Sequence, residues 1–289
     1  MSYIDEYPHN AQKHWQSQWH TASIFIDSAT QPIREKQLGL KHADVGASLN
    51  NLASIYRDKG EFAKAEPLFK RSLQISEEAL GSDHPEVANV LGNIAMLYKK
   101  QGDYVQAEPL YKRALAIDEK KLGADHLSVA MSLNNLAILY MNQGKNDAAE
   151  PLLQRSLAIR EKQLAANDSR IATIHNSLGC FYFVKNDYGK AESCYKRALN
   201  IREKSLGSGH PNVATCLNNL ALVYEGQNDF KNAEASYRRS VKITEDTFGE
   251  NHPKVAERLI KLVALLRATD RTTEADALEE RVARLNGGR

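Results

Sequence analysis

A chain of 289 residues with a formal net charge of +2 has room for one large domain or two ordinary ones, and its basic and acidic residues are interspersed. This balance gives no electrostatic reason to expect a nucleic-acid or anionic-membrane partner, and no apolar run approaches the roughly 20 residues that a membrane-spanning helix needs. Three widely spaced cysteines without a CxxC pair fit a reducing compartment, and the first residues lack the basic start and apolar core of a secretory signal. We therefore expect a cytoplasmic location.

The first 31 residues carry an apolar stripe at helical spacing, which is interrupted before Gln31 and Pro32. The stripe consists of Trp15, Trp19, Ala22 and Ile26. An array of helices exposes its core at each end unless a further element covers it. We therefore predict that residues 1–31 form an N-terminal extension with a capping helix.

Beyond this extension, five similar segments follow one another at a constant interval of 42 residues. They read SLNNLASIY, VLGNIAMLY, SLNNLAILY, IHNSLGCFY and CLNNLALVY, and they begin at Ser48, Val90, Ser132, Ile174 and Cys216. Self-similarity at such a period is typical of solenoid proteins. The predicted repeats cover residues 43–84, 85–126, 127–168, 169–210 and 211–252.

Each repeat contains two apolar patterns with the spacing of a helix rather than the alternation of a strand. In repeat 1, a first helix is expected before the break at 58–60 and a second helix before Gly81, whose missing side chain suits a helix end. Pro85 suits the first turn of the next helix, and Asp83 can cap it. The tyrosine near the end of each first helix is predicted to be buried: Tyr56, Tyr98, Tyr140, Tyr182 and Tyr224.

The order L-x-x-L-A-x-x-Y-x-x-x-G in these segments resembles the tetratricopeptide repeat. The 42-residue length, AEPLYKRAL and LGxDHPxVA resemble the variant found in kinesin light chains and their prokaryotic relatives. The resemblance covers about residues 32–289. It implies an all-α fold, a right-handed α-solenoid of tetratricopeptide-type helical hairpins over 32–252, with 253–289 as a degenerate capping repeat.

For function, the resemblance implies a peptide-binding adaptor, although a fold alone never settles function. The length leaves no room for the heptad region through which kinesin light chains meet their motor, so a motor-adaptor role is not expected. Chaperone-binding members of the family hold a terminal carboxylate with lysine and arginine, where this chain has Asn50, Gly92 and Asn134. An acidic C-terminal tail is therefore not the expected ligand.

Metal and catalytic chemistry find little support in the motifs. Five histidines occupy the same loop position of successive repeats: His42, His84, His126, His210 and His252. Neighbouring repeats lie about 10 Å apart, whereas zinc ligands lie about 2 Å from the ion, so we interpret the histidines as structural. No GxSxG, glycine-rich phosphate loop or Cys/His arrangement is present. We expect no enzymatic activity, no cofactor and no metal site.

Asparagines recur in the middle of the first helices, where their amides compete with the helical backbone. By the resemblance, the first asparagine of each repeat faces a concave groove and the second lies at the junction between helices. Groove residues could hold the backbone of an extended peptide; the alternatives are a bond to the neighbouring helix and simple inheritance by duplication. The candidates for peptide contact are Asn50, Asn134, Asn176 and Asn218.

Other groove positions change character along the chain. Repeats 1 and 2 supply Arg57, Lys99 and Lys100, whereas repeats 3 and 4 supply Ile138, Met141 and Phe183. A matching ligand would be an extended protein segment, acidic at one end and apolar in the middle.

We therefore predict a monomeric scaffold or adaptor that binds a segment of a partner protein. Two alternatives remain open from the sequence. The solenoid could assemble on itself as an architectural element, or it could serve as a regulatory subunit of a larger signalling or enzyme complex.

Overall fold

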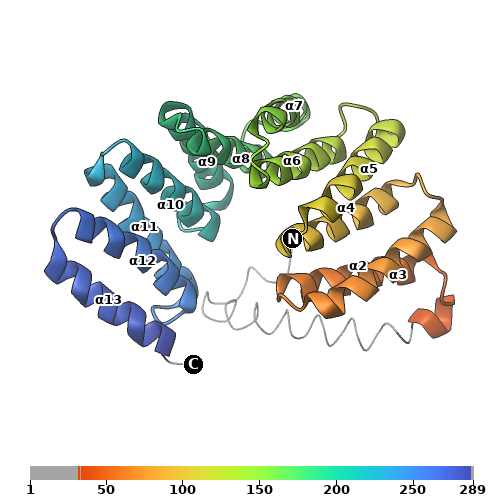
Figure 1. The fold of residues 1–289 in the computed structure, drawn as a ribbon, viewed down its shortest axis with the longest axis horizontal. Helices are drawn as coiled ribbons and strands as arrows, with labels where there is room; N and C mark the ends of the chain where they lie inside the picture. The colour runs from red at the N-terminus through yellow and green to blue at the C-terminus, as the bar shows by residue number, and fades with distance from the viewer. Residues whose placement is uncertain (1–31, 33, 288–289) are drawn as a thin grey trace. The chain divides into compact units, whose positions relative to one another are not determined.

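The computed structural model describes residue 32 and residues 34–287, and within this part every regular element is a helix (Figure 1). The first helices of the repeats are α2 (Ala43–Asp58), α4 (Pro85–Lys100), α6 (Leu127–Asn142), α8 (Ser169–Val184), α10 (Pro211–Gly226) and α12 (Pro253–Ala268). The second helices are α3 (Phe62–Leu80), α5 (Tyr104–Leu122), α7 (Asn146–Gln163), α9 (Tyr188–Leu206), α11 (Phe230–Phe248) and α13 (Thr272–Gly287). The stripe formed by Trp15, Trp19, Ala22 and Ile26 lies outside the described residues, so its capping role stays a prediction.

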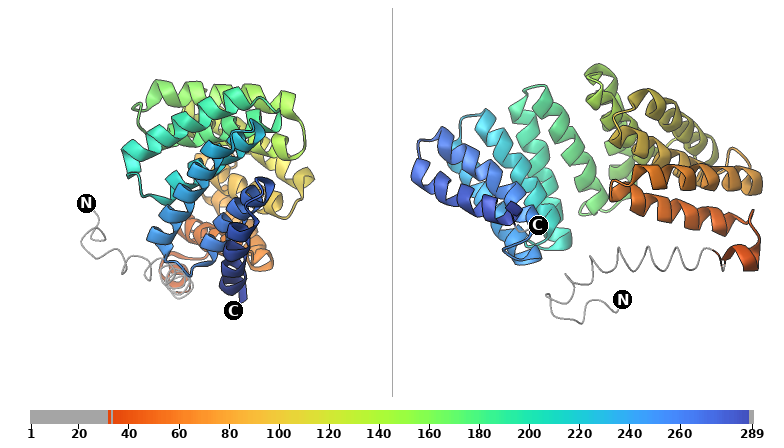
Figure 2. Two further views of the ribbon diagram at one scale, coloured as in Figure 1. Left: turned by 90° about the vertical axis from the view of Figure 1, so that its left-hand side faces the viewer. Right: turned by 60° about the horizontal axis from the view of Figure 1, so that its bottom comes forward.

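The helices keep the register of the sequence repeat. Each first helix begins 42 residues after the previous one, and so does each second helix. Two compact units contain the array, Met1–Ile159 and Arg160–Arg289, which we call the N-terminal and C-terminal units. Within each unit, consecutive helical hairpins pack side by side, which confirms the predicted all-α solenoid fold (Figures 1 and 2).

The loop histidines cap the helices that follow them. The Nδ1 atom of His84 accepts a hydrogen bond from the backbone N–H of Glu86 (3.2 Å), and Pro85 occupies the first helical position. The same bond recurs at His42, His126, His210 and His252, whereas repeat 4 uses a carboxylate, Asp168. The prediction that Asp83 caps α4 was therefore wrong by one residue. The N-cap is His84, whose imidazole nitrogen accepts the bond that a carboxylate oxygen was expected to accept.

Tyrosine burial also differs from the expectation. Only Tyr98 is fully buried among the five first-helix tyrosines; the others are half-buried. The hydroxyl groups of Tyr98 and Tyr140 reach glutamates on the preceding second helix, Glu66 (3.2 Å) and Glu108 (3.3 Å). At Tyr140 this polar contact accompanies a ring that lies in the core with its hydroxyl near solvent. The second helices also bury aromatic residues deeply, namely Phe69, Tyr111, Tyr195 and Tyr237, and the first helix α8 buries Phe181.

Ion pairs link the second helices of neighbouring repeats at a separation of 36 residues. Arg113 pairs with Glu77 (2.6 Å), and Arg281 pairs with Glu245 (2.6 Å). Further pairs with the same separation are Arg71–Glu35, Arg155–Glu119 and Arg239–Glu203. Each pair is partly exposed and contributes little alone. The pairs join α3 to α5 and α5 to α7 in the N-terminal unit, and α9 to α11 and α11 to α13 in the C-terminal unit.

Small residues allow the two helices of a hairpin to approach closely. Ala53, Ala95, Ala137 and Ala221 are completely buried, and repeat 4 has Gly179 at the equivalent position. A Cβ atom at Gly179 would lie 2.7 Å from the ring of Tyr195, whose hydroxyl donates to Sγ of Cys180 (3.1 Å). The glycine is therefore required by the bulk of the facing ring.

We expect Gly179→Ala to destabilise the chain by about 1–2 kcal/mol, because overpacking against Tyr195 outweighs the better helix propensity of alanine. Gly189→Ala on α9 is the matched control, since its Cβ would make only an ordinary 3.9 Å contact. The control should stabilise slightly. Urea unfolding of both variants measures the difference, and equal midpoints would contradict the packing argument.

One buried histidine makes stability depend on pH. His175 stands where the other repeats have leucine, and both of its ring nitrogens are buried without a hydrogen-bond partner among the described residues. Burial, with a smaller contribution from the cation of Arg197, lowers the pKa of His175 to about 4. Burial likewise lowers the pKa of the capping residues His210 and His252.

We expect stability to be complete above about pH 6.5, where histidine is neutral in the unfolded chain, and to fall as the pH drops toward 4. The folded state resists the proton that the unfolded state accepts, so His175 should account for about 2 kcal/mol of this loss after solvent screening. His175→Leu should flatten the dependence of the melting temperature on pH between 7 and 4.5. An unchanged slope in this variant would place the acid sensitivity elsewhere.

Candidate functional site

The predicted groove residues share one face of the first helices. Positions i, i+4 and i+7 lie on the same side of a helix, and in repeat 3 these are Asn134, Ile138 and Met141 on α6. Repeat 2 supplies Lys99, followed by Lys100, on α4, and repeat 1 supplies Asn50 and Arg57 on α2. In the C-terminal unit the corresponding residues are Asn176 and Phe183 on α8 and Asn218 on α10.

The asparagines form hydrogen bonds between neighbouring repeats. In the N-terminal unit, Nδ2 of Asn93 donates to Oδ1 of Asn50 (3.0 Å). In the C-terminal unit, Nδ2 of Asn219 donates to Oδ1 of Asn176 (2.9 Å). In both cases the second-position asparagine of one repeat binds the first-position asparagine of the repeat before it. The Oδ1 atoms of Asn50 and Asn176 therefore have a structural role, which is one of the alternatives left open by the sequence.

Several amide groups on this face remain without a partner. Asn50, Asn134 and Asn218 are at least nine-tenths buried, yet their Nδ2 groups donate to no described residue. Oδ1 of Asn134 and Oδ1 of Asn218 also lack a described partner. At Asn218 the 42-residue repeat of the sequence explains this. The next repeat has Lys261 where an asparagine would donate.

The basic residues of repeats 1 and 2 are arranged around one carboxylate. Nε of Arg57 donates to Asp58 (3.1 Å), Nη1 donates to Oδ1 of Asn93 (3.0 Å), and the guanidinium lies 5.9 Å from the Phe69 ring centroid. Lys100 pairs with the same Asp58 (3.0 Å). Partial burial acts to raise the pKa of Asp58, but the hydrogen bonds from Arg57 and Lys100 outweigh it and lower that pKa. Arg57 is buried, so its charge is largely committed to this cluster.

Lys99 differs from these two cations. Its side chain is half-buried and forms no ion pair or hydrogen bond with any described residue. Burial, followed by repulsion from Lys100 and Arg57, lowers its pKa. An incoming carboxylate would relieve this repulsion, so Lys99 is the basic side chain on this face best placed to gain from an acidic ligand.

The predicted apolar residues are all half-buried. Ile138 and Met141 present part of their surface on α6. Phe183 packs against the cluster that contains Tyr195 and Leu220, and its ring centroid lies 5.7 Å from that of Tyr188. Phe183 is therefore anchored in the core, and part of the surface of all three side chains stays accessible.

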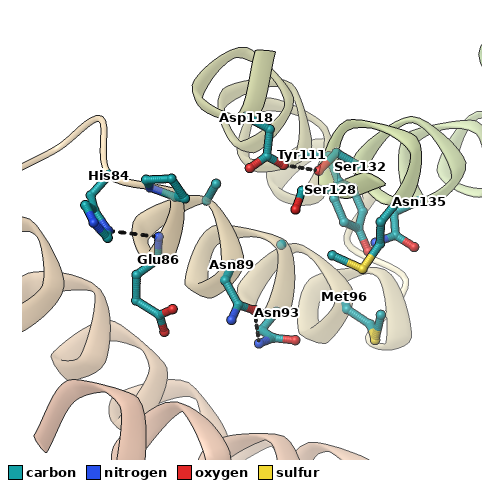
Figure 3. A pocket seen from close by; sticks show the side chains of 14 residues that line it. His84, Glu86, Asn89, Asn93, Met96, Tyr111, Asp118, Ser128, Ser132 and Asn135 are labelled. Carbon is teal, nitrogen blue, oxygen red and sulfur yellow. Dashed lines mark hydrogen bonds between the residues drawn. The ribbon is translucent and has the colours of Figure 1, made fainter. Parts of the chain in front are cut away.

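A cavity of about 430 Å³ in the N-terminal unit is lined by residues of α4, α5 and α6 (Figure 3). Tyr111 and Asp118 of α5 line it, and Oγ of Ser132 donates to Oδ2 of Asp118 (2.8 Å). Burial raises the pKa of Asp118 against the opposing effect of Ser132. Sequence reasoning missed these residues, although a signal exists: Gly92, which also lines the cavity, replaces the asparagine found at this position in the other four repeats.

Residue 32 and residues 34–287 show neither a metal-binding cluster nor a membrane-spanning helix. No group of three or more His, Cys, Asp or Glu side chains there could hold a metal ion, and none of the helices in these ranges has the length and apolar character of a membrane span. Cys180, Cys194 and Cys216 are free thiols, and burial raises the pKa of each. These thiols are therefore poorly ionised at neutral pH.

The asparagine bond gives a matched test of its energetic role. Asn93→Ala should destabilise the chain by about 1–2 kcal/mol, because Oδ1 of Asn50 and Nη1 of Arg57 each lose the hydrogen bond to Asn93. Asn135→Ala removes the same side chain one repeat later, where Gly92 offers no partner, and should be nearly neutral. Urea denaturation of both variants measures the difference; equal losses would mean that the observed bond does not stabilise the array.

Comparison with known proteins supports the architecture. A family model for the tetratricopeptide repeat matches residues 44–120, 86–162 and 170–246, which together amount to more than half of the chain. A search of curated proteins finds no significant match.

Solved structures give further likenesses. BtubC (BKLC) from P. vanneervenii superposes with a TM-score of 0.66 at 25% identity, covering 80% of this chain and 92% of that one. A putative kinesin light chain with nearly identical TPR-like repeats from Podosopora anserina gives a TM-score of 0.61 at 25% identity, covering 70% and 96%. The APC/C hetero-tetramer Cut9–Hcn1 superposes with a TM-score of 0.65 at 15% identity, and the match covers 93% of this chain and 45% of that one. At this identity the likeness shows the fold alone. With its 42-residue register, its hairpin packing and these matches, the chain belongs to the tetratricopeptide repeat family, in the kinesin-light-chain-like form.

Proposed function

We propose that this chain is a non-enzymatic adaptor that binds an extended segment of a partner protein along the face of its first helices. Membership of the tetratricopeptide repeat family supports a protein-interaction scaffold in general. The observation that carries the finer proposal is the row of partly buried polar, basic and apolar side chains that the 42-residue register repeats on one face.

The amides of this row supply contacts that do not depend on the ligand's sequence. Asn50 and Asn176 use Oδ1 within the protein and keep their Nδ2 groups for a ligand. Asn134 and Asn218 have both ends of the amide without a described partner. A backbone carbonyl of an extended segment is the acceptor that fits such donors, so these four asparagines would hold the main chain of the partner.

The side chains of the N-terminal unit favour an acidic and apolar sequence. Lys99 would attract an aspartate or glutamate, with Arg57 and Lys100 adding to the positive potential around it. Ile138 and Met141 on α6 offer partly exposed apolar surface for a bulky side chain of the same segment. In the C-terminal unit, Phe183 is the corresponding apolar anchor.

We expect a peptide with Asp or Glu beside a bulky apolar residue to bind more tightly than its Asn or Gln counterpart, with the preference lost at high salt. Lys99→Gln should weaken binding about two- to fivefold, mainly by slowing association, because a partly exposed charge steers more than it holds. Fluorescence anisotropy of labelled peptides on the full chain measures both effects.

Lys121→Gln is the matched control, since it removes the same charge from an exposed position on α5. Phe183→Ala should instead accelerate dissociation, as loss of an apolar anchor does. If acidic and neutral peptides bind alike, or if Lys121→Gln and Lys99→Gln act equally, the assignment of the acidic site is wrong. Light scattering at several concentrations tests the alternative of self-assembly, for which a mass that rises with concentration is expected.

A further inference from the structure

The asparagine row is interrupted at one place, and the interruption opens a cavity. The other four repeats carry Asn50, Asn134, Asn176 and Asn218 where repeat 2 has Gly92. A Cβ atom at Gly92 would meet nothing within 4 Å. The volume that an asparagine amide would fill is therefore empty, and the cavity of about 430 Å³ lies beside it.

Asp118 gives this cavity an acidic floor. Its side chain is 5% exposed and comes from α5, the second helix of the same hairpin. Oδ2 accepts from Ser132, but no lysine, arginine or histidine forms an ion pair with this carboxylate among the residues that the structure describes. A buried carboxylate without a cation is unfavourable, so the site would gain from one. The equivalent positions in the other repeats are Ser76, Arg160, Arg202 and Thr244, none of which is acidic.

The walls of the cavity fit the stem of a long side chain. Met96 and Ala88 on α4 and Met131 on α6 line the cavity, and Figure 3 labels Met96 among the lining side chains. The lining residues include a second carboxylate, Glu86, and neither lysine nor arginine. His84 accepts a hydrogen bond at Nδ1 from the backbone N–H of Glu86. The cavity therefore combines apolar walls with net negative charge.

Asn135 adds a contact at the edge. It lines the cavity from α6, and its amide forms no hydrogen bond with a described residue, because Gly92 supplies no partner. The amide can therefore hold backbone groups of a ligand whose side chain enters the cavity.

We propose that this cavity is a receptor for one lysine or arginine side chain of the partner protein, with Asp118 as its counter-ion and Asn135 holding the adjoining backbone. The proposal deepens the proposed binding of a protein segment and rests on it. The alkyl stem would pass between the two methionines, as long basic side chains commonly do on apolar surfaces. The volume lies within the range of ordinary ligand pockets.

Methionine methyl NMR tests the proposal directly, because the chain has four methionines: Met1, Met96, Met131 and Met141. The probe is Nα-acetyl-lysine methylamide, and its neutral counterpart is Nα-acetyl-norleucine methylamide. The lysine probe should shift the methyl signals of Met96 and Met131 and leave Met141, which does not line the cavity, unchanged. The neutral counterpart should bind about tenfold more weakly or worse.

Two variants complete the test. Asp118→Asn keeps a hydrogen-bond acceptor for Ser132 and should weaken the lysine probe about tenfold or more, whereas Asp44→Asn on α2 is the charge control and should not. Gly92→Asn should restore the asparagine bond to Asn135, raise the melting temperature and abolish binding of the probe. This variant is expected to be more stable than the parent, so its loss of binding cannot come from unfolding.

Equal shifts with both probes, no shifts, or binding that survives in Gly92→Asn would overturn the proposal. Anisotropy with the acidic peptides separates this outcome from failure of the broader function. If those peptides bind the full chain while the lysine probe does not, the cationic receptor is wrong and the adaptor stands. If neither binds, both are wrong.

Discussion

A helical hairpin of this size cannot bury its own apolar face, and the rest of the structure depends on this constraint. Each hairpin is covered only by its neighbours, so its two helices must approach closely and must meet the next hairpin in a constant register. The completely buried alanines of the first helices and the buried aromatic rings of the second helices meet this need. Where the ring is Tyr195, even an alanine is too large, and repeat 4 has Gly179.

The same constraint places polar groups at the contacts between hairpins, where they need partners. On the first-helix face the asparagines bind one another, and on the second helices arginine and glutamate pair at a separation of 36 residues. The second-helix charges thus largely satisfy each other. The first-helix face keeps amide donors and the cation of Lys99 without a described partner, which is why the two faces differ in their capacity to bind a ligand.

The sequence predicts the fold well, because period, helical spacing and small residues all report the same repeated packing. It predicts the functional face less completely. The spacing that places Asn134, Ile138 and Met141 on one face of α6 can be seen within a single repeat. The hydrogen bond from Arg57 to Asn93 cannot, because it joins residues that are 36 positions apart. The cavity could be predicted only by combining two positions at which repeat 2 differs from the other repeats. These are Gly92 and Asp118, which lie on different helices. The half-burial of Tyr140 accompanies a hydrogen bond to Glu108 on another helix, which no single helix reveals.

Gly92 also has a mechanical meaning. In the N-terminal unit, repeats 1 and 2 are joined on their first-helix face by the bond between Asn50 and Asn93, whereas repeats 2 and 3 lack this bond. A force that separates the first helices would therefore meet less resistance between α4 and α6 than between α2 and α4. Because of Gly92, the first helices α4 and α6 should separate before α2 and α4 when the chain is pulled. A ligand bound in the cavity would contact both α4 and α6 and would therefore strengthen their association.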